Sequence, residues 1–172
     1  MTTNITNANN KKPNTLSTSN DFVRKYLIAA QNASAGSKIF PATILAAAAL
    51  ESGNGRSALA LKYNNFFGIK ADVTWKGKKT VFETKEQDRS GKVFTVKAAF
   101  RWYDTAEESF RNYVHFVTGN RYINAGILTA ASPAEQFASL HKAGYATDIN
   151  YVIKLNEKLK SFGDSIPPIT KV

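Results

Sequence analysis

Residues 41–55, with the sequence PATILAAAALESGNG, decide the fold of this chain. Pro41 suits the first turn of a helix, and the alanine-rich run from Ala42 to Glu51 predicts that the helix continues. Its positions are apolar nearly all round, and a helix without a polar face belongs in the middle of a core. Gly53 and Gly55 favour its end. We therefore expect a central buried helix over residues 42–51.

Upstream of this helix the chain changes character near residue 20. Residues 1–19 are dominated by Asn, Thr, Ser and Lys, a composition that predicts a disordered arm. Ser19 or Asn20 can cap a following helix. The apolar residues of that helix recur at roughly helical spacing: Phe22, Tyr26, Ile28 and Ala29.

Downstream, residues 94–103 alternate between two sets of side chains, a period of two that predicts a strand. Residues 79–86 are a second candidate strand, and residues 88–91 supply turn formers between them. A β-hairpin is the simplest account of this region.

The remainder predicts helices with explicit start signals. Thr105 with Glu108, and Ser132 with Glu135, match the capping box. Thr147 or Asp148 would cap a last helix that ends before residue 163. The order of elements indicates an α+β fold, with a mostly helical lobe and a small β-hairpin lobe. We expect one domain over residues 20–163 and a loose tail over residues 164–172.

The composition limits the chemistry and the partners. The chain has 172 residues, of which 43% are hydrophobic and 21% charged, as in globular proteins. The chain has 23 Lys and Arg residues and 13 Asp and Glu residues, so its net charge is +10. This charge favours a polyanionic partner: nucleic acid, an anionic membrane surface or an acidic cell-wall polymer. With no cysteine and only His115 and His141, a disulfide scaffold, a cysteine nucleophile and a thiolate zinc site are excluded, and carboxylates are the favoured catalysts.

The distribution of apolar and basic residues along the chain argues against two classes of partner, membranes and nucleic acids. The sequence has no apolar run of about 18 residues, so we expect no insertion into a membrane. The lysines are scattered, with a short run only at Lys76, Lys78 and Lys79, which argues against nucleic acid. Residues 1–20 have no apolar core of the kind found in a secretory signal, so we expect none there.

Glu51 is the first candidate catalytic residue. It stands at the end of the apolar helix, where the helix dipole and the apolar neighbours both disfavour its ionised form. A carboxyl with a raised pKa can serve as a general acid. The alternative is a glutamate that simply points to water beyond the helix end.

Glu83 and Glu86 are candidates for a second carboxylate on the hairpin. They lie three residues apart, so they face opposite sides of a regular strand, and at most one would face a cleft. Either one, paired with Glu51 across a cleft, would complete the two-carboxylate arrangement that hydrolyses glycosidic bonds. The alternative is that both are solvated charges.

A third group consists of aromatic and amide side chains that suit sugar binding, since rings stack on sugar C–H faces and amides bind hydroxyls. Each ring could instead belong to the core. The candidates for substrate binding or the cleft are Asn64, Asn65, Phe66, Phe67, Trp75, Tyr122 and Tyr145.

Taken in order, six segments resemble glycoside hydrolase family 73, the endo-β-N-acetylglucosaminidases that hydrolyse peptidoglycan. The resemblance covers about residues 20–163. The segments are ALESGNG (49–55), NNFFGIK (64–70), WKG (75–77), TKE (84–86), FRWY (100–103) and GYATD (144–148). The chain departs from the family at Asn54, where an aromatic residue is common, and at Ile149, where proline is usual.

The resemblance implies a lysozyme-like fold in which the two lobes flank a substrate cleft. It implies cleavage of the β-1,4 bond between N-acetylglucosamine and N-acetylmuramic acid by a monomer without cofactor or metal. Glu51 matches the catalytic acid, Glu86 matches the second carboxylate within its Thr-x-Glu segment, and Glu83 is the alternative. Tyr145 matches a tyrosine near the acid, and Thr147 of the same segment joins the substrate-binding set.

The resemblance leaves several alternatives open. An inverting, a retaining and a substrate-assisted mechanism all fit. So do a lytic transglycosylase or muramidase on the same fold and a non-catalytic cell-wall-binding module. We expect action at the bacterial cell wall, reached by phage release, as part of a virion or by a special export route.

Overall fold

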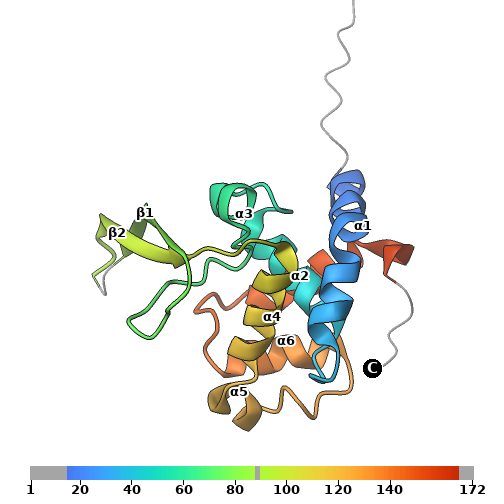
Figure 1. Ribbon diagram of the computed structural model, residues 1–172. Coiled ribbons are helices and arrows are strands. Elements are labelled where there is room, and N and C mark those ends of the chain that lie inside the picture. The colour runs from blue at the N-terminus through green and yellow to red at the C-terminus, as the bar shows by residue number, and fades with distance from the viewer. Residues whose placement is uncertain (1–14, 88–89, 167–172) are drawn as a thin grey trace, which may run out of the picture.

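The computed structural model describes residues 15–87 and 90–166, which form a helical body with one projecting β-hairpin (Figure 1). The fold is α+β, as expected. The elements in order are α1 (Thr15–Ser34), α2 (Pro41–Ser52), α3 (Ala58–Tyr63), β1 (Lys79–Gln87), β2 (Val93–Arg101), α4 (Ala106–Val117), α5 (Asn120–Asn124), α6 (Pro133–Lys142), α7 (Tyr151–Lys160) and a 3₁₀ turn, η1 (Gly163–Ser165). None of the helices in these two ranges is long and apolar enough to cross a membrane.

Helix α2 is the centre of the body, which confirms the prediction from residues 41–55. Every residue from Ala42 to Ala49 is at most 2% exposed, and α2 contacts α1, α4, α6 and α7. Pro41 occupies the first helical turn, and Gly53 ends the helix in the left-handed conformation with φ 59°. Small alanine side chains allow the surrounding helices to approach closely, so the sequence of α2 suits its place in the core.

Two predicted helix starts are wrong. Helix α1 begins at Thr15, five residues before the expected start, so that the predicted arm over residues 1–19 overlaps it. Ser19 is buried, and its Oγ accepts a hydrogen bond from Ser161 Oγ at 3.1 Å, so polar residues here belong to the packed body. The rest of the predicted arm, residues 1–14, lies outside the described residues, as does most of the predicted tail.

The last helix, α7, begins at Tyr151 after an N-cap Asn150 that makes no side-chain cap. The predicted cap Asp148 lies too early. Its carboxylate accepts from the Asn150 N–H at 2.9 Å and pairs with Lys154 Nζ at 2.5 Å, forming a turn that precedes the helix.

The helices α4 and α6 start where the capping signals predicted. Thr105 Oγ1 accepts from the Glu108 N–H at 3.1 Å, and the Glu108 carboxylate accepts from the backbone N–H of Asp104 at 2.9 Å. Ser132 and Glu135 repeat this arrangement at the start of α6. In both helices the carboxylate reaches one residue further back than in the usual capping box.

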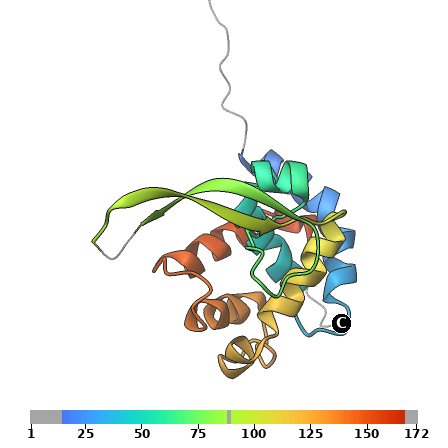
Figure 2. The same ribbon diagram turned by 60° about the vertical axis from the view of Figure 1, so that its left-hand side comes forward.

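The predicted hairpin is present as an antiparallel pair in which Lys79 lies opposite Arg101 and Glu86 opposite Phe94. Its base packs on the helical body through the ring of Tyr63, whose centroid is 5.1 Å from that of Trp102. The far part of the hairpin arches away from the helices (Figure 2). Residues 88 and 89 of the predicted turn lie outside the described residues. The short helices α3 and α5 were not predicted.

Candidate active site

Glu51 lies in the last turn of α2, and its side chain lines a cavity of about 390 Å³. The chain leaves the helix immediately afterwards, because Gly53 and Asn54 both adopt left-handed conformations with φ 59°. Asparagine tolerates this conformation better than an aromatic residue does. Asn54 therefore takes part in ending α2, and its side chain accepts from Lys158 Nζ at 3.3 Å.

Glu51 is an exposed residue at the open side of the cavity, and many protein atoms lie around its carboxyl group. Burial raises the pKa of this carboxyl, and the hydrogen bond that Tyr151 Oη donates to Glu51 Oε1 at 3.0 Å acts in the opposite direction. Burial is the larger of the two effects. A raised pKa keeps more of the carboxyl protonated at a given pH, which is the state that a general acid needs.

Three tyrosines pack around this carboxyl. Tyr145 lines the cavity with Glu51, its ring stacks on Tyr151 with centroids 5.8 Å apart, and it meets the edge of Tyr113 at 5.9 Å. Burial raises the pKa of Tyr113 and of Tyr145 well above the ordinary value. These phenols are therefore neutral when Glu51 titrates. The buried Tyr113 hydroxyl has no hydrogen-bond partner among the described residues.

The opposite wall of the cavity comes from the chain after α3, the end of β2 and the segment around α5. Phe67 stacks on Tyr113, with ring centroids 3.9 Å apart and an interplanar angle of 6°, and so connects this wall to the core. Besides Glu51 and Tyr145, the residues lining the cavity are Phe67, Gly68, Ile69, Lys70, Asp72, Phe116, Arg101, Arg121 and Ala146.

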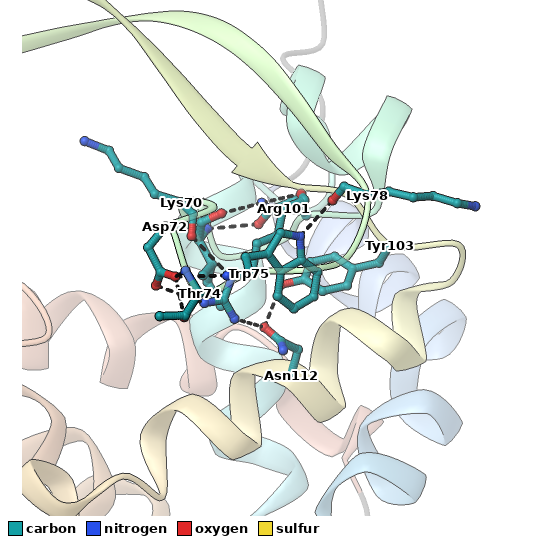
Figure 3. A network of polar contacts seen from close by, with 10 residues as sticks. Lys70, Asp72, Thr74, Trp75, Lys78, Arg101, Tyr103 and Asn112 are labelled. Atoms are coloured by element: carbon teal, nitrogen blue, oxygen red, sulfur yellow. Dashed lines mark hydrogen bonds and ion pairs between the residues drawn. The ribbon is translucent and has the colours of Figure 1, made fainter.

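Arg101, at the end of β2, holds this wall together through a polar network (Figure 3). Its guanidinium donates to Asn112 Oδ1 at 2.9 Å, lies 3.5 Å from the Asp72 carboxylate and stacks on the Trp75 ring at 4.5 Å from its centroid. Tyr103 Oη donates to the same Asn112 oxygen at 2.7 Å. The network therefore fixes the base of the hairpin and the loop before it on helix α4.

Asp72 is a second carboxyl at the cavity, and sequence reasoning missed it. Thr74 Oγ1 donates to Asp72 Oδ1 at 2.5 Å and the Thr74 N–H donates to the same atom at 2.8 Å. These hydrogen bonds, chiefly the one from the Thr74 hydroxyl, hold the pKa of Asp72 below its usual value. The cavity therefore contains one carboxyl whose pKa is raised and one whose pKa is lowered.

The predicted substrate-binding amides do not line this cavity. Asn64 Nδ2 donates to the backbone oxygens of Tyr103 and Asp104, at 3.1 and 3.0 Å. Asn65 is 1% exposed. It donates to the carbonyls of Ile69 and Arg101 and accepts from the Ile69 N–H. Both amides connect the backbone of the cavity wall to the end of β2.

Replacing Asn65 by alanine is therefore expected to lower the free energy of unfolding by about 2–4 kcal/mol, because the Ile69 N–H and the Arg101 carbonyl lose their Asn65 partner, while the Ile69 carbonyl keeps the Arg101 N–H. Urea denaturation of Asn65→Ala and wild type measures this change. Asn124→Ala, at an exposed position of α5, is the matched control and is expected to stay within about 0.5 kcal/mol. Unchanged stability with weaker substrate binding would instead return Asn65 to the binding set.

The structure also separates the other predicted binding residues. Phe66 and Tyr122 are each 1% exposed and belong to the core. Trp75 lines a second cavity of about 380 Å³, on the side of the network that faces α4. Thr147 is exposed and does not line the cavity that contains Glu51. Phe67 and Tyr145 are thus the predicted aromatic residues that the fold brings to Glu51.

Glu83, the first of the two hairpin glutamates, does not line this cavity. Glu83 is exposed and lies opposite Lys97 in the hairpin register. Glu86 is seven residues along β1 from Lys79, whose partner Arg101 lines the cavity. The side chain of Glu86 lies outside the described part of the chain, so its role stays a prediction.

Three charged residues of the cavity, Asp72, Arg101 and Arg121, have no local signal that marks them as functional. Arg101 and Lys70 lie inside segments that carry the family resemblance, but no catalytic chemistry points to them. No group of three or more His, Asp or Glu side chains in residues 15–87 and 90–166 is arranged to hold a metal ion.

Comparison with known proteins gives consistent matches. The profile of the glucosaminidase family, described as mannosyl-glycoprotein endo-β-N-acetylglucosaminidase, matches residues 28–164. The peptidoglycan hydrolase FlgJ of Salmonella typhimurium is 39% identical over 157 residues, which cover 86% of this chain and 48% of that protein. The chain thus spans about half the length of the curated relatives it matches.

Solved structures match the fold as well. The catalytic domain of the autolysin Auto from Listeria monocytogenes has a TM-score of 0.76 and 26% identity, covering 92% of this chain and 90% of that one. A C-terminally truncated glycoside hydrolase domain of Salmonella typhimurium FlgJ has a TM-score of 0.70 and 37% identity, covering 85% and 98%.

Proposed function

The chain belongs to the glucosaminidase family, and from this premise we propose that it hydrolyses peptidoglycan with Glu51 as the general acid. The bond cleaved is the β-1,4 bond between N-acetylglucosamine and N-acetylmuramic acid in the glycan strand. The names of two similar proteins, a peptidoglycan hydrolase and an autolysin, support this substrate.

One observation carries the proposal: a glutamate with a raised pKa opens onto a cavity large enough for a sugar ring and is held there by a tyrosine hydroxyl. Glu51 Oε1 accepts from Tyr151, which itself is 4% exposed and fixed in α7. The carboxyl therefore has a defined position and faces the cavity where substrate would bind. Its raised pKa favours the protonated form that a general acid needs.

In the first step Glu51 protonates the glycosidic oxygen as the bond to the anomeric carbon breaks. The carboxylate formed keeps the hydrogen bond from Tyr151, which stabilises the charge left behind. The neutral ring of Tyr145 forms a wall of the same cavity. Water then adds to the anomeric carbon, either activated by a second carboxylate or after attack by the acetamido oxygen of the substrate.

The net charge of +10 concerns the approach to the wall rather than the chemistry. Peptide stems and attached polymers make the wall acidic, so long-range attraction speeds association. Salt screens this attraction. Lysis of intact cell walls should therefore slow as ionic strength rises, while cleavage of short soluble fragments changes less.

Digestion of purified peptidoglycan in ¹⁸O-labelled water tests the reaction. We expect fragments that end in N-acetylglucosamine with the label at the new reducing end. Fragments ending in 1,6-anhydro-muramic acid would show a lytic transglycosylase instead, and labelled muramic acid ends would show a muramidase.

Replacing Tyr151 by phenylalanine is expected to move the alkaline limb of the kcat/KM profile to higher pH. Activity needs protonated Glu51 and falls as the pH rises through its pKa. Tyr151 stabilises the ionised form, so its loss raises the pKa of Glu51 further. Rates on soluble glycan fragments across pH measure the limb for Tyr151→Phe and for Tyr26→Phe, a control on α1. If the alkaline limb of Tyr151→Phe lies at the same pH as in wild type, or at a lower pH, the assignment of Glu51 as the general acid is contradicted.

A further inference from the structure

Arg121 lines the same cavity as Glu51 and is held there by two aromatic rings. Its guanidinium lies 4.5 Å from the centroid of the Tyr122 ring and 5.6 Å from that of Phe116, and it donates a hydrogen bond to Tyr122 Oη. These contacts hold one part of the guanidinium and limit its motion. Arg121 is thus a positive charge already ordered at the cavity.

No carboxylate in the described part of the chain forms an ion pair with Arg121. Arg101, which lines the same cavity, differs from Arg121 because protein acceptors occupy its N–H donors. Arg101 uses its donors on Asp72, Asn112 and the Lys70 carbonyl. A guanidinium has five N–H donors, and Arg121 has most of its donors directed at no acceptor among the described residues.

Arg121 does not serve the catalytic carboxyl either. Among the described residues no ion pair joins Arg121 to Glu51, and the Glu51 carboxyl accepts its hydrogen bond from Tyr151. The reaction centre also becomes positive, because glycoside cleavage passes through an oxocarbenium-like transition state. A fixed cation beside that centre would oppose the reaction. A cation elsewhere in the cavity gains most from a negative group on the substrate, because its N–H donors bond more strongly to an ionised acceptor than to a neutral sugar oxygen.

We propose that Arg121 binds a carboxylate on the lactyl-peptide branch of the muramic unit while Glu51 acts on the neighbouring glycosidic bond. This inference rests on the proposed function and deepens it. The sugar backbone of peptidoglycan is neutral, so its carboxylates lie on this branch. A planar guanidinium that is fixed by stacking can bind a carboxylate through two parallel hydrogen bonds, which a lysine cannot reproduce.

Three soluble substrates separate the sources of the carboxylate. The first is glycan fragments with their native peptide stems. The second is the same fragments after carbodiimide coupling to ammonia, which converts stem carboxylates to neutral amides. The third is fragments stripped by an amidase, in which the lactyl carboxylate is free. The sugars are identical in all three, so differences in kcat/KM report the branch alone.

For the native fragments we expect Arg121→Gln to lower kcat/KM about tenfold, mainly through KM, since a charge-assisted hydrogen bond is lost. Arg121→Lys should recover part of the loss. On amidated fragments wild type and Arg121→Gln should be nearly equal. The lactyl carboxyl is an amide in the native fragments, so a loss confined to them assigns a stem carboxylate. A wild-type preference for stripped over amidated fragments would show that a free lactyl carboxylate also binds Arg121.

Arg24→Gln is the matched control, because it removes one positive charge from an exposed site on α1. It should leave the ratio of native to amidated activity at the wild-type value. An equal loss for Arg121→Gln on native and amidated fragments would overturn the inference and indicate a structural role. If wild type cleaves none of the three substrates, the proposed function itself fails.

Discussion

Replacing Glu51 by glutamine is expected to reduce peptidoglycan hydrolysis by about 1,000-fold, within the range that general acids contribute. Glutamine has nearly the same shape, and its carbonyl oxygen can still accept from Tyr151. It has no proton to deliver to the leaving oxygen. Loss of turbidity of a peptidoglycan suspension and the release of new reducing ends measure the change.

Glu157→Gln is the matched control for this variant, because Glu157 is exposed on α7. It should retain wild-type activity. Circular dichroism and thermal unfolding verify the fold of Glu51→Gln. Burial raises the pKa of Glu51, which means that its ionised form destabilises the folded state at high pH. Near pH 8 the glutamine variant should therefore be at least as stable as wild type. Full lytic activity would contradict the assignment of Glu51.

Replacing Glu86 by glutamine is expected to lower kcat about 10- to 100-fold, while Glu83→Gln stays within about threefold of wild type. Glu86 is seven residues along β1 from the register pair that borders the Glu51 cavity. At about 3.3 Å per residue this is about 23 Å along the strand. In the proposed mechanism Glu86 assists only the second step, after the hairpin bends over bound substrate, so we expect a large but incomplete loss.

Asp72→Asn separates this assignment from its rival within the cavity. Asp72 lines the cavity with Glu51, and hydrogen bonds from Thr74 keep its pKa low. If Glu86→Gln is nearly as active as wild type and a folded Asp72→Asn is not, the second carboxylate is Asp72. A larger loss for Glu83→Gln than for Glu86→Gln would assign Glu83.

Sequence patterns within a few residues were sufficient to predict the central helix, the hairpin and the starts of α4 and α6. The apolar helix before Gly53, the alternation along the hairpin and the capping pairs at Thr105 and Ser132 each depend on neighbours within a few residues. The errors arose where tertiary packing outweighed composition. Polar Ser19 is buried through a contact with Ser161, which lies 142 residues away, and no local pattern records such a contact.

For the site, the sequence singled out Glu51 as the candidate acid, because it stands at the end of an apolar helix and within a segment that resembles the family motif. The tertiary structure decided what surrounds that acid. Burial places Asn65 in the packed wall, and packing brought Asp72, Arg101 and Arg121 to one cavity from segments far apart in the chain. Helical and strand periods act over a few residues, whereas a cavity is formed by segments whose distances depend on the packing of the whole core.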